Sequence, residues 1–308
     1  MKRIVTCVSG MLLAFGLAAC GGGGGDTPST VTYTGLETQA EITETNSEPL
    51  ATGAAGSKSK QEAAAIFYGA SAGLEQGGEG GSVPNRLDDL LKGVVAKIDF
   101  QQAGSLQFVA VTQGGRLTDD GCGGYADYSG SDNGSRVDVS LSLHNFCVYD
   151  LVTSGYVFLN GRMRSVVTYA NDPSDPYNWS SLLIDIGYLE VRYSGQTYKF
   201  SGNILMDFAA GTVTFTHSYF DGGKVYRIQN FSYDEATEAL SGRFYHPDYG
   251  YVDFDGIVRY DADGLPTMGS TVTITGQTGT ATFTMTGSSL YEVCWDDGTA
   301  NNCFTGSW

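Results

Sequence analysis

The sequence is poor in proline, in histidine and in basic residues, and the shortage of basic residues limits the partners that the protein can have. It has 7 Pro against 43 Gly, three His, and 17 Lys and Arg against 34 Asp and Glu, for a net charge of −17. A surface this negative repels nucleic acids and anionic lipid head groups, which argues against both as partners. Phosphate-binding loops, dinucleotide fingerprints, haem-attachment motifs and recognisably spaced catalytic carboxylates are also lacking.

The first twenty residues are organised as an export signal. Lys2 and Arg3 precede an apolar segment, residues 4–17, which is shorter than the roughly 20 residues that span a membrane. It ends in Leu17-Ala18-Ala19-Cys20, which resembles the lipobox of bacterial lipoproteins. The resemblance implies that residues 1–19 are removed and that Cys20 receives acyl chains such as palmitate, which anchor the protein in a membrane. An ordinary secretory signal with a chance cysteine is the alternative.

The residue after the cysteine bears on location. Gly21 stands where lipoproteins of the inner membrane usually carry Asp, so the resemblance implies the outer membrane, on either its periplasmic or its surface face. Residues 20–30 are then the lipidated cysteine and a Gly-rich, flexible tether. Without residues 1–19 the chain keeps 15 basic and 34 acidic residues, a net charge of −19.

Four cysteines remain for the mature domain, and an even number in an oxidising compartment predicts disulfides. Proximity in sequence favours the pairs Cys122–Cys147 and Cys294–Cys303. A zinc site of four thiolates is the rival, but the sequence has no C-x-x-C spacing.

Residues 31–105 are predicted to be a helical or irregular segment that packs on a sheet. One short helix is expected from an Asn46 cap, with Pro49 in the first turn, to about Ala55. A second is expected over Lys60–Tyr68. A third, residues 85–98, is amphipathic, because its apolar residues recur at i, i+3, i+4 and i+7: Leu87, Leu90, Leu91, Val94, Val95 and Ile98.

Residues 106–308 change to a period of two. Val137, Val139 and Leu141 alternate with polar residues, and the same pattern recurs to the C-terminus. Strands with one buried and one wet face, joined by short turns, predict antiparallel hairpins. We expect a mainly β fold, an antiparallel meander of about ten to thirteen strands forming a sandwich or an open half-barrel. A change of phase predicts a bulge near Gly187.

A second resemblance covers most of the mature chain. It rests on Tyr33-Thr34-Gly35-Leu36 with the helix from Asn46, on the segment Gly242–Asp253, and on an acidic C-terminal hairpin ending in Trp308. These features resemble an uncharacterised family of β-rich bacterial outer-membrane lipoproteins. The resemblance implies a single β domain and no particular activity.

Nucleophile and histidine chemistry have few candidates. Gly69-Ala70-Ser71-Ala72-Gly73 matches the G-x-S-x-G elbow of esterases, but a Gly-rich stretch follows where that elbow needs a helix, so a linker is favoured. His144 falls in the polar phase of its strand and His217 in the apolar phase. His246 and Asp248 fit a turn, and a metal role would need a third ligand.

Acidic turns are the remaining candidates for a structural calcium ion. Asp261 and Asp263 form one pair, and Asp296 and Asp297 form the other. Oxygen ligands in tight loops suit calcium, but solvated turns explain these residues equally well. No other cofactor is expected.

Aromatic side chains would indicate a binding surface only if they form a contiguous patch. The residues concerned are Tyr177, Trp179, Tyr249, Tyr251 and Trp295. We expect a non-enzymatic, lipid-anchored β protein of the outer membrane or cell surface with a structural or interaction role. A half-barrel carrier of lipid or another apolar ligand is the alternative, and a hydrolase with an unrecognised site is a third. The partner, whether protein, polysaccharide or lipid, is not specified.

Overall fold

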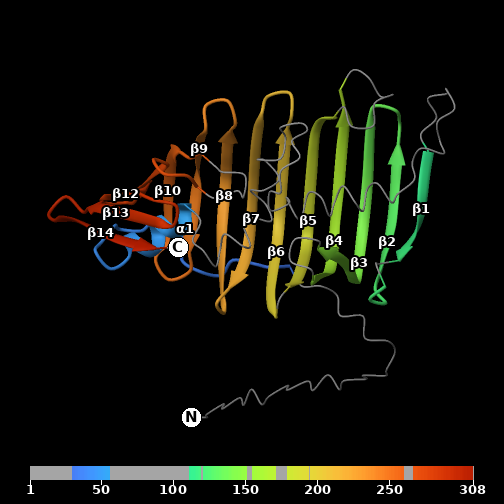
Figure 1. The fold of residues 1–308 in the computed structure, drawn as a ribbon, viewed down its shortest axis with the longest axis horizontal. Helices are drawn as coiled ribbons and strands as arrows, with labels where there is room; N and C mark the ends of the chain where they lie inside the picture. The colour runs from blue at the N-terminus through green and yellow to red at the C-terminus, as the bar shows by residue number, and fades with distance from the viewer. Residues whose placement is uncertain are drawn as a thin grey trace, which may run out of the picture.

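The fold is one long antiparallel sheet, seen face-on in Figure 1. A computed structural model describes residues 30–55, 111–118, 121–150, 155–170, 179–193, 195–259 and 266–307. Its strands are β1 (Val111–Thr118), β2 (Tyr125–Asp132), β3 (Arg136–Asp150), β4 (Gly155–Tyr169), β5 (Trp179–Tyr193), β6 (Gln196–Asp207), β7 (Thr212–Asp221), β8 (Lys224–Asp234), β9 (Ala239–His246), β10 (Gly250–Ile257), β11 (Thr271–Thr275), β12 (Thr280–Met285), β13 (Leu290–Asp296) and β14 (Asn301–Ser307).

Each strand pairs with the next in sequence, so the spatial order runs from β1 to β14 without a crossover. The prediction of a mainly β, antiparallel meander is confirmed, with fourteen strands where about ten to thirteen were expected. The short turns expected between strands include Ala210-Gly211, Gly222-Gly223 and Thr278-Gly279, each of which lies between successive strands. Strands β1 to β8 stand side by side, whereas β12 to β14, at the end of the sheet beyond β9 and β10, run at a steep angle to them (Figure 1).

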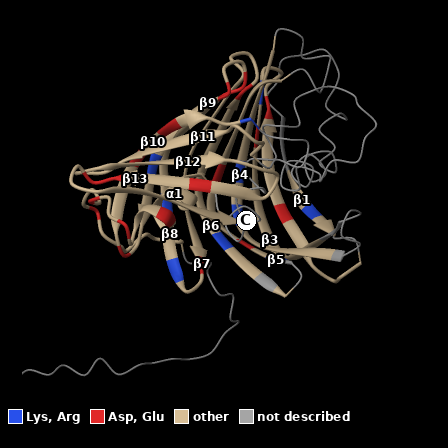
Figure 2. Ribbon diagram, turned by 60° about the vertical axis from the view of Figure 1, so that its left-hand side comes forward, with Lys and Arg blue, Asp and Glu red and all other residues tan. Residues whose placement is uncertain are grey.

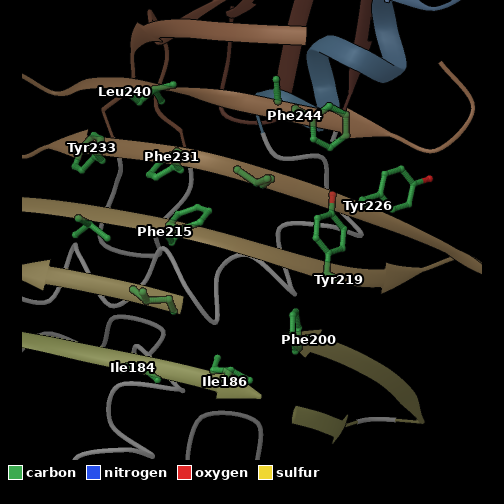
Figure 3. Close-up of a cluster of buried hydrophobic side chains, with 14 of the residues drawn as sticks. Ile184, Ile186, Phe200, Phe215, Tyr219, Tyr226, Phe231, Tyr233, Leu240 and Phe244 are labelled. Carbon is green, nitrogen blue, oxygen red and sulfur yellow. The ribbon is translucent and has the colours of Figure 1, made fainter. Parts of the chain in front are cut away.

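The alternation of side chains gives the sheet two unlike faces. One face, here called the inner face, carries the buried core, including Phe200, Phe215, Phe231 and Phe244. Figure 3 shows aromatic and aliphatic side chains from β5 to β9 gathered on this face. Phe215 and Phe231, directly opposite on β7 and β8, stack with ring centroids 4.1 Å apart. The opposite, outer face is mainly polar.

A line of irregular residues crosses the middle strands. The pairing register shifts at Asn145 on β3, near Gly187 on β5 and at Asn230 on β8. Asn145 and Asn230 have positive φ angles of 48° and 54°. Each bulge inserts one residue, which switches the faces on which later side chains lie. The predicted bulge near Gly187 is therefore confirmed, and it keeps Leu189 on the inner face after Ile186.

The N-terminal part of the described chain crosses the outer face before it reaches the core. Residues 31–42, here called the strap, form a parallel bridge between Gln39 and Tyr251 on β10. The amide of Ile42 then donates to the carbonyl oxygen of Thr278 at 2.9 Å. Ser201, on the outer face of β6, donates to the carbonyl oxygen of Val31 at 2.7 Å. The strap thus ties β6, β10 and the β11–β12 turn together.

Helix α1 (Ser47–Ala55) follows the strap and packs on the inner face against β9, β11, β12 and β13. Leu50 and Ala51 are fully buried. The predicted helix boundaries are confirmed, and Asn46 precedes the first helical residue, with its carbonyl oxygen accepting from the Leu50 amide at 3.1 Å. Its side chain does not have the expected capping role. Its Oδ1 accepts from the Thr43 amide at 2.8 Å and its Nδ2 donates to the Glu41 carbonyl, so the side chain closes the preceding turn instead of capping the helix amides.

Both predicted disulfides are formed. Cys122–Cys147 ties the loop before β2 to β3, across the hairpin that turns at residues 132–134. Cys294–Cys303 joins directly opposite residues of β13 and β14. These pairings exclude a zinc site of four thiolates in this structure, because all four sulfurs are bonded in disulfides.

Several predictions lie outside the described residues. They are the signal peptide and Cys20, the tether, the helices over 60–68 and 85–98, the G-x-S-x-G segment, and Asp261 and Asp263. Within the described ranges, α1 is the one helix, and no helix is long and apolar enough to cross a membrane.

Candidate functional site

The outer face presents polar side chains in straight rows across the sheet. One row runs from β3 to β7 through directly paired residues: Ser140, Arg164, Asp185, Asn203 and Thr216. Side chains directly opposite on neighbouring strands are close enough to interact, so such a row is a regular array of hydrogen-bonding groups. Figure 2 places Lys and Arg along the strands and shows Asp and Glu also at the turns.

Ion pairs fix part of this array. Asp138 accepts two hydrogen bonds from Arg164, at 2.8 and 2.6 Å, and one from Arg136 at 3.2 Å. The bond from Arg164 is the main reason why the pKa of the Asp138 carboxyl lies below its usual range. Two-point pairing of this kind holds a guanidinium in a defined plane. The outer face of β3 and β4 is therefore pre-ordered.

A similar ion pair lies on the outer face at the β1 end of the sheet. Arg116 makes two hydrogen bonds to Asp127 and its guanidinium carbon lies 3.8 Å from the centre of the Tyr125 ring. Tyr125 stacks in turn on His144, with ring centroids 4.5 Å apart. His144 is exposed on the outer face, as its phase predicted. In this stack of Arg116, Tyr125 and His144, the role of His144 is to pack against the Tyr125 ring.

Arg162 differs from these cations. Its side chain is exposed between Ser142 and Tyr188, and it makes no ion pair or hydrogen bond to another residue of the described ranges. Along β4 and β5 the nearby cations Arg164 and Arg192 are each held, the first by Asp138 and the second by Glu190 and Asn145. An arginine with free donors beside a fixed array is suited to contact a partner.

Apolar residues lie in the neighbouring row of the same face. Val166, Leu183 and Leu205 are directly paired across β4, β5 and β6. Val166 is buried although it does not belong to the core cluster, and Leu205 is 40% exposed. We call these three residues the outer apolar spot. An apolar centre beside arginines and polar side chains is the composition typical of the middle of a protein interface.

His217 lies on the inner face, as predicted. Its ring is packed between Phe215 and Tyr219, at 4.8 and 5.6 Å between centroids. Burial lowers the pKa of His217 to about 3. The imidazole is therefore neutral over the physiological range and acts as part of the core.

His246 is held in the β9–β10 turn. Its Nδ1 accepts a hydrogen bond from the Asp248 amide at 3.2 Å, and its ring stacks on Tyr249 at 4.4 Å. An imidazole that accepts at Nδ1 carries its proton on Nε2, so neither nitrogen offers a lone pair to a metal in this state. The Asp248 carboxylate is paired with Lys224. The two residues form a local turn structure.

The acidic turn between β13 and β14 is closed by its own side chains. Oδ1 of Asp296 accepts from the Gly298 amide at 2.8 Å, and Oδ1 of Asp297 accepts from the amides of Thr299 and Ala300 at 2.7 Å. These backbone hydrogen bonds lower the pKa of Asp297. Calcium binding here stays a prediction, which a titration of thermal stability against calcium would check.

The aromatic residues considered as a binding patch do not share one face, as far as the structure describes them. Trp295 is buried on the inner face, while Tyr251 lies on the outer face under Arg243, 4.0 Å from its guanidinium carbon. Trp179 packs against Phe208 at 6.3 Å, and Tyr249 is 37% exposed at its turn. Tyr177 lies outside the described residues. These four therefore do not form a contiguous binding patch.

Sequence reasoning missed the outer apolar spot and Arg162. Leu183 and Leu205 each sit in a run of consecutive apolar residues, Leu182–Ile184 and Ile204–Met206, in which both faces of the strand are apolar. That interruption of the alternation was the available signal. Its meaning depends on the register of three strands, which the sequence does not state.

No protein-family model, curated protein or solved structure matches this chain.

Proposed function

We propose that this chain is a lipid-anchored protein of the outer membrane or cell surface, and that its β domain has a structural or interaction role without catalysis. The lipobox at Leu17–Cys20 supports the anchor. The outer face of β3–β6 supports the interaction role, because it combines a fixed polar array with exposed, unpaired groups.

One observation carries the proposal: the outer apolar spot lies directly beside the ion-paired array. Its Val166 is opposite Asp138 on β3 and two residues after Arg164 on β4. Apolar centres surrounded by ordered polar groups are favourable for protein contacts, because the rim excludes water while little side-chain entropy remains to be lost. A protein partner docked on β3–β6 is therefore the preferred occupant.

Anchoring is tested by cell fractionation and by protease treatment of intact cells. Wild type should sediment with membranes, and Cys20→Ala should not be lipidated and should leave the membrane fraction. Loss of the domain from intact cells under protease places it on the surface, and loss only after lysis places it on the periplasmic face. A Cys20→Ala protein that remains in membranes would refute the anchor.

The interaction face is tested by site-specific photo-cross-linking in living cells. A photoreactive residue at position 205 should give a discrete cross-linked product. The matched control is position 257, since Ile257 is also an exposed aliphatic residue, 51% exposed, but lies on β10. Equal cross-linking at both positions, or none at 205, would contradict the proposed face.

A half-barrel carrier for lipid or another apolar ligand is the second candidate. It is favoured by the length of the apolar inner face, which extends over β3–β9, while α1 packs at one end of the sheet against β9 and β11–β13. Solvent extraction of the purified protein followed by mass spectrometry would detect a stoichiometric ligand. Absence of any extractable molecule other than the N-terminal lipid would reject this candidate.

A further inference from the structure

The edge of the sheet brings two sulfurs and a carboxylate together. Cys294 on β13 lies directly opposite Cys303 on β14, and Glu292 precedes Cys294 by two residues on the same, outer face. The two Sγ atoms and a Glu292 carboxylate oxygen all lie within 4.8 Å of one another. Among the described residues, this is the one group of three metal-ligating side chains at such spacing.

The surroundings leave this group accessible. Cys303 is exposed, and Cys294 and Glu292 are partly exposed. Glu292 lies opposite Thr305 and has no ion pair or hydrogen bond to any part of the chain that the structure describes. Asp296 on the other side of Cys294 is different, because its Oδ1 already accepts from the Gly298 amide. Glu292 is therefore the carboxylate available to a ligand.

We propose that the Cys294–Cys303 pair is a redox-gated site for Zn²⁺, with Glu292 as third ligand and water in the fourth position. A dithiol reductant attacks the exposed disulfide, so that the sulfur–sulfur bond of the protein breaks and the reductant becomes a disulfide. The two protein thiols then each release a proton as Zn²⁺ binds two thiolates and the carboxylate. Two sulfur ligands, one oxygen ligand and water form a tetrahedral set that zinc accepts.

The strand ladder, and not the disulfide alone, keeps the ligands in place. The pairs Val293–Phe304 and Trp295–Asn302 flank the cysteines, and Val293 and Trp295 are buried. The Cα atoms of Cys294 and Cys303 lie 4.0 Å apart. Two thiolates, each about 2.3 Å from one Zn²⁺ in a tetrahedral set, lie about 3.8 Å from each other, a separation that rotation of the two side chains can provide after reduction.

The second disulfide provides the matched comparison. Cys122 and Cys147 also become thiols on reduction, but Cys147 is buried, and among the described residues the group of three ligating side chains is the one that contains Cys294 and Cys303. A zinc site at β13–β14 therefore depends on one cysteine pair and is indifferent to the other.

The experiment titrates the mature full-length protein with Co²⁺ and then Zn²⁺, before and after reduction with a phosphine. The reduced protein and its C122S/C147S variant should each bind one ion with the absorption of cobalt–thiolate bonds, and the oxidised protein should bind none. C294S/C303S should lose binding. Reduced protein that binds no ion, or C294S/C303S that binds as wild type does, would overturn the site.

Glu292→Gln in the C122S/C147S background keeps both sulfur ligands and the buried residues of the hairpin. It should weaken zinc binding by about tenfold or more, since even partners of metal ligands contribute 10–100-fold to affinity. Unchanged affinity would remove Glu292 from the site. This variant tests the zinc site even if C294S/C303S fails to fold. The results for zinc are independent of the membrane anchor.

Discussion

The backbone of Gly202 on β6 packs directly against the carbonyl oxygen of Thr216 on β7, at a φ angle of +143°. A Cβ atom at this position would collide with that oxygen and with the Cα atom of His217. Gly202 lies level with the bulge near Gly187 on β5, so the close contact belongs to the line of irregular residues across the sheet.

Gly202→Ala should therefore lower the free energy of unfolding by about 1–3 kcal/mol, because both the backbone conformation and the space exclude a side chain. Urea denaturation followed by circular dichroism measures the change. Gly187→Ala is the control within the same bend, since its nearest atom would be the Arg162 carbonyl oxygen at 3.8 Å. Equal effects of the two substitutions would contradict the close contact.

Acid should destabilise the fold partly through His217. Burial lowers its pKa from 6.5 to about 3, so the unfolded chain takes up the proton first. The contribution is fully present above about pH 6.5 and is lost as the pH falls towards 3, on the order of 1 kcal/mol for each pH unit. His217→Phe should flatten the dependence of unfolding free energy on pH between 5 and 7.

Carboxylates such as Asp138, whose pKa is lowered, leave a residual slope at lower pH in both proteins. His144→Phe, at the exposed histidine of β3, is the control for removing an imidazole that the fold does not bury. The explanation is wrong if His217→Phe and His144→Phe change the slope equally.

The strap should depend on Arg227. Its guanidinium carbon lies 3.7 Å from the Tyr245 ring centre and 4.8 Å from that of Tyr33, and it pairs with Glu37 at 2.7 Å. Arg227→Lys should cost about 1–2 kcal/mol, because an ammonium cannot stack on both rings and reach Glu37. Chemical denaturation provides the measurement.

Arg259→Lys is the matched control, since Arg259 also pairs with a carboxylate, Glu238, but is 67% exposed. It should change stability by a few tenths of a kcal/mol at most. Equal losses in the two variants would show that stacking in the strap contributes nothing.

The two disulfides should differ in their effect on stability. Cys122–Cys147 closes 25 residues and Cys294–Cys303 closes 9. Chain entropy predicts losses of about 3–4 kcal/mol for C122S/C147S and about 2–3 kcal/mol for C294S/C303S. Denaturation of both variants under non-reducing conditions checks the order, and a larger loss in C294S/C303S would contradict it.

Local pattern predicted much of the sheet. Alternation in stretches such as Val137–Leu143 identified strands and their wet faces, because one buried face imposes a period of two. The change of phase between Ile186 and Leu189 identified a bulge for the same reason. The disulfides followed from spacing, since each pair lies within one or two hairpins.

Contacts between distant residues could not be predicted. Tyr33 donates to the carbonyl oxygen of His246, 213 residues away, and no local pattern in the strap indicates that it crosses the outer face. The outer apolar spot likewise exists only because registers on both sides of β5 align Val166, Leu183 and Leu205. Asn145 and Asn230 have positive φ angles at their bulges. Asparagine tolerates such angles, but its presence in a sequence does not predict them.

The proposed anchor is the claim on which location and function depend, and mass spectrometry of the N-terminal peptide from native membranes tests it most directly. The account predicts that the mature chain begins at Cys20 and carries acyl chains on its thiol and amino group. An unmodified N-terminus, or one that begins at another residue, would contradict it.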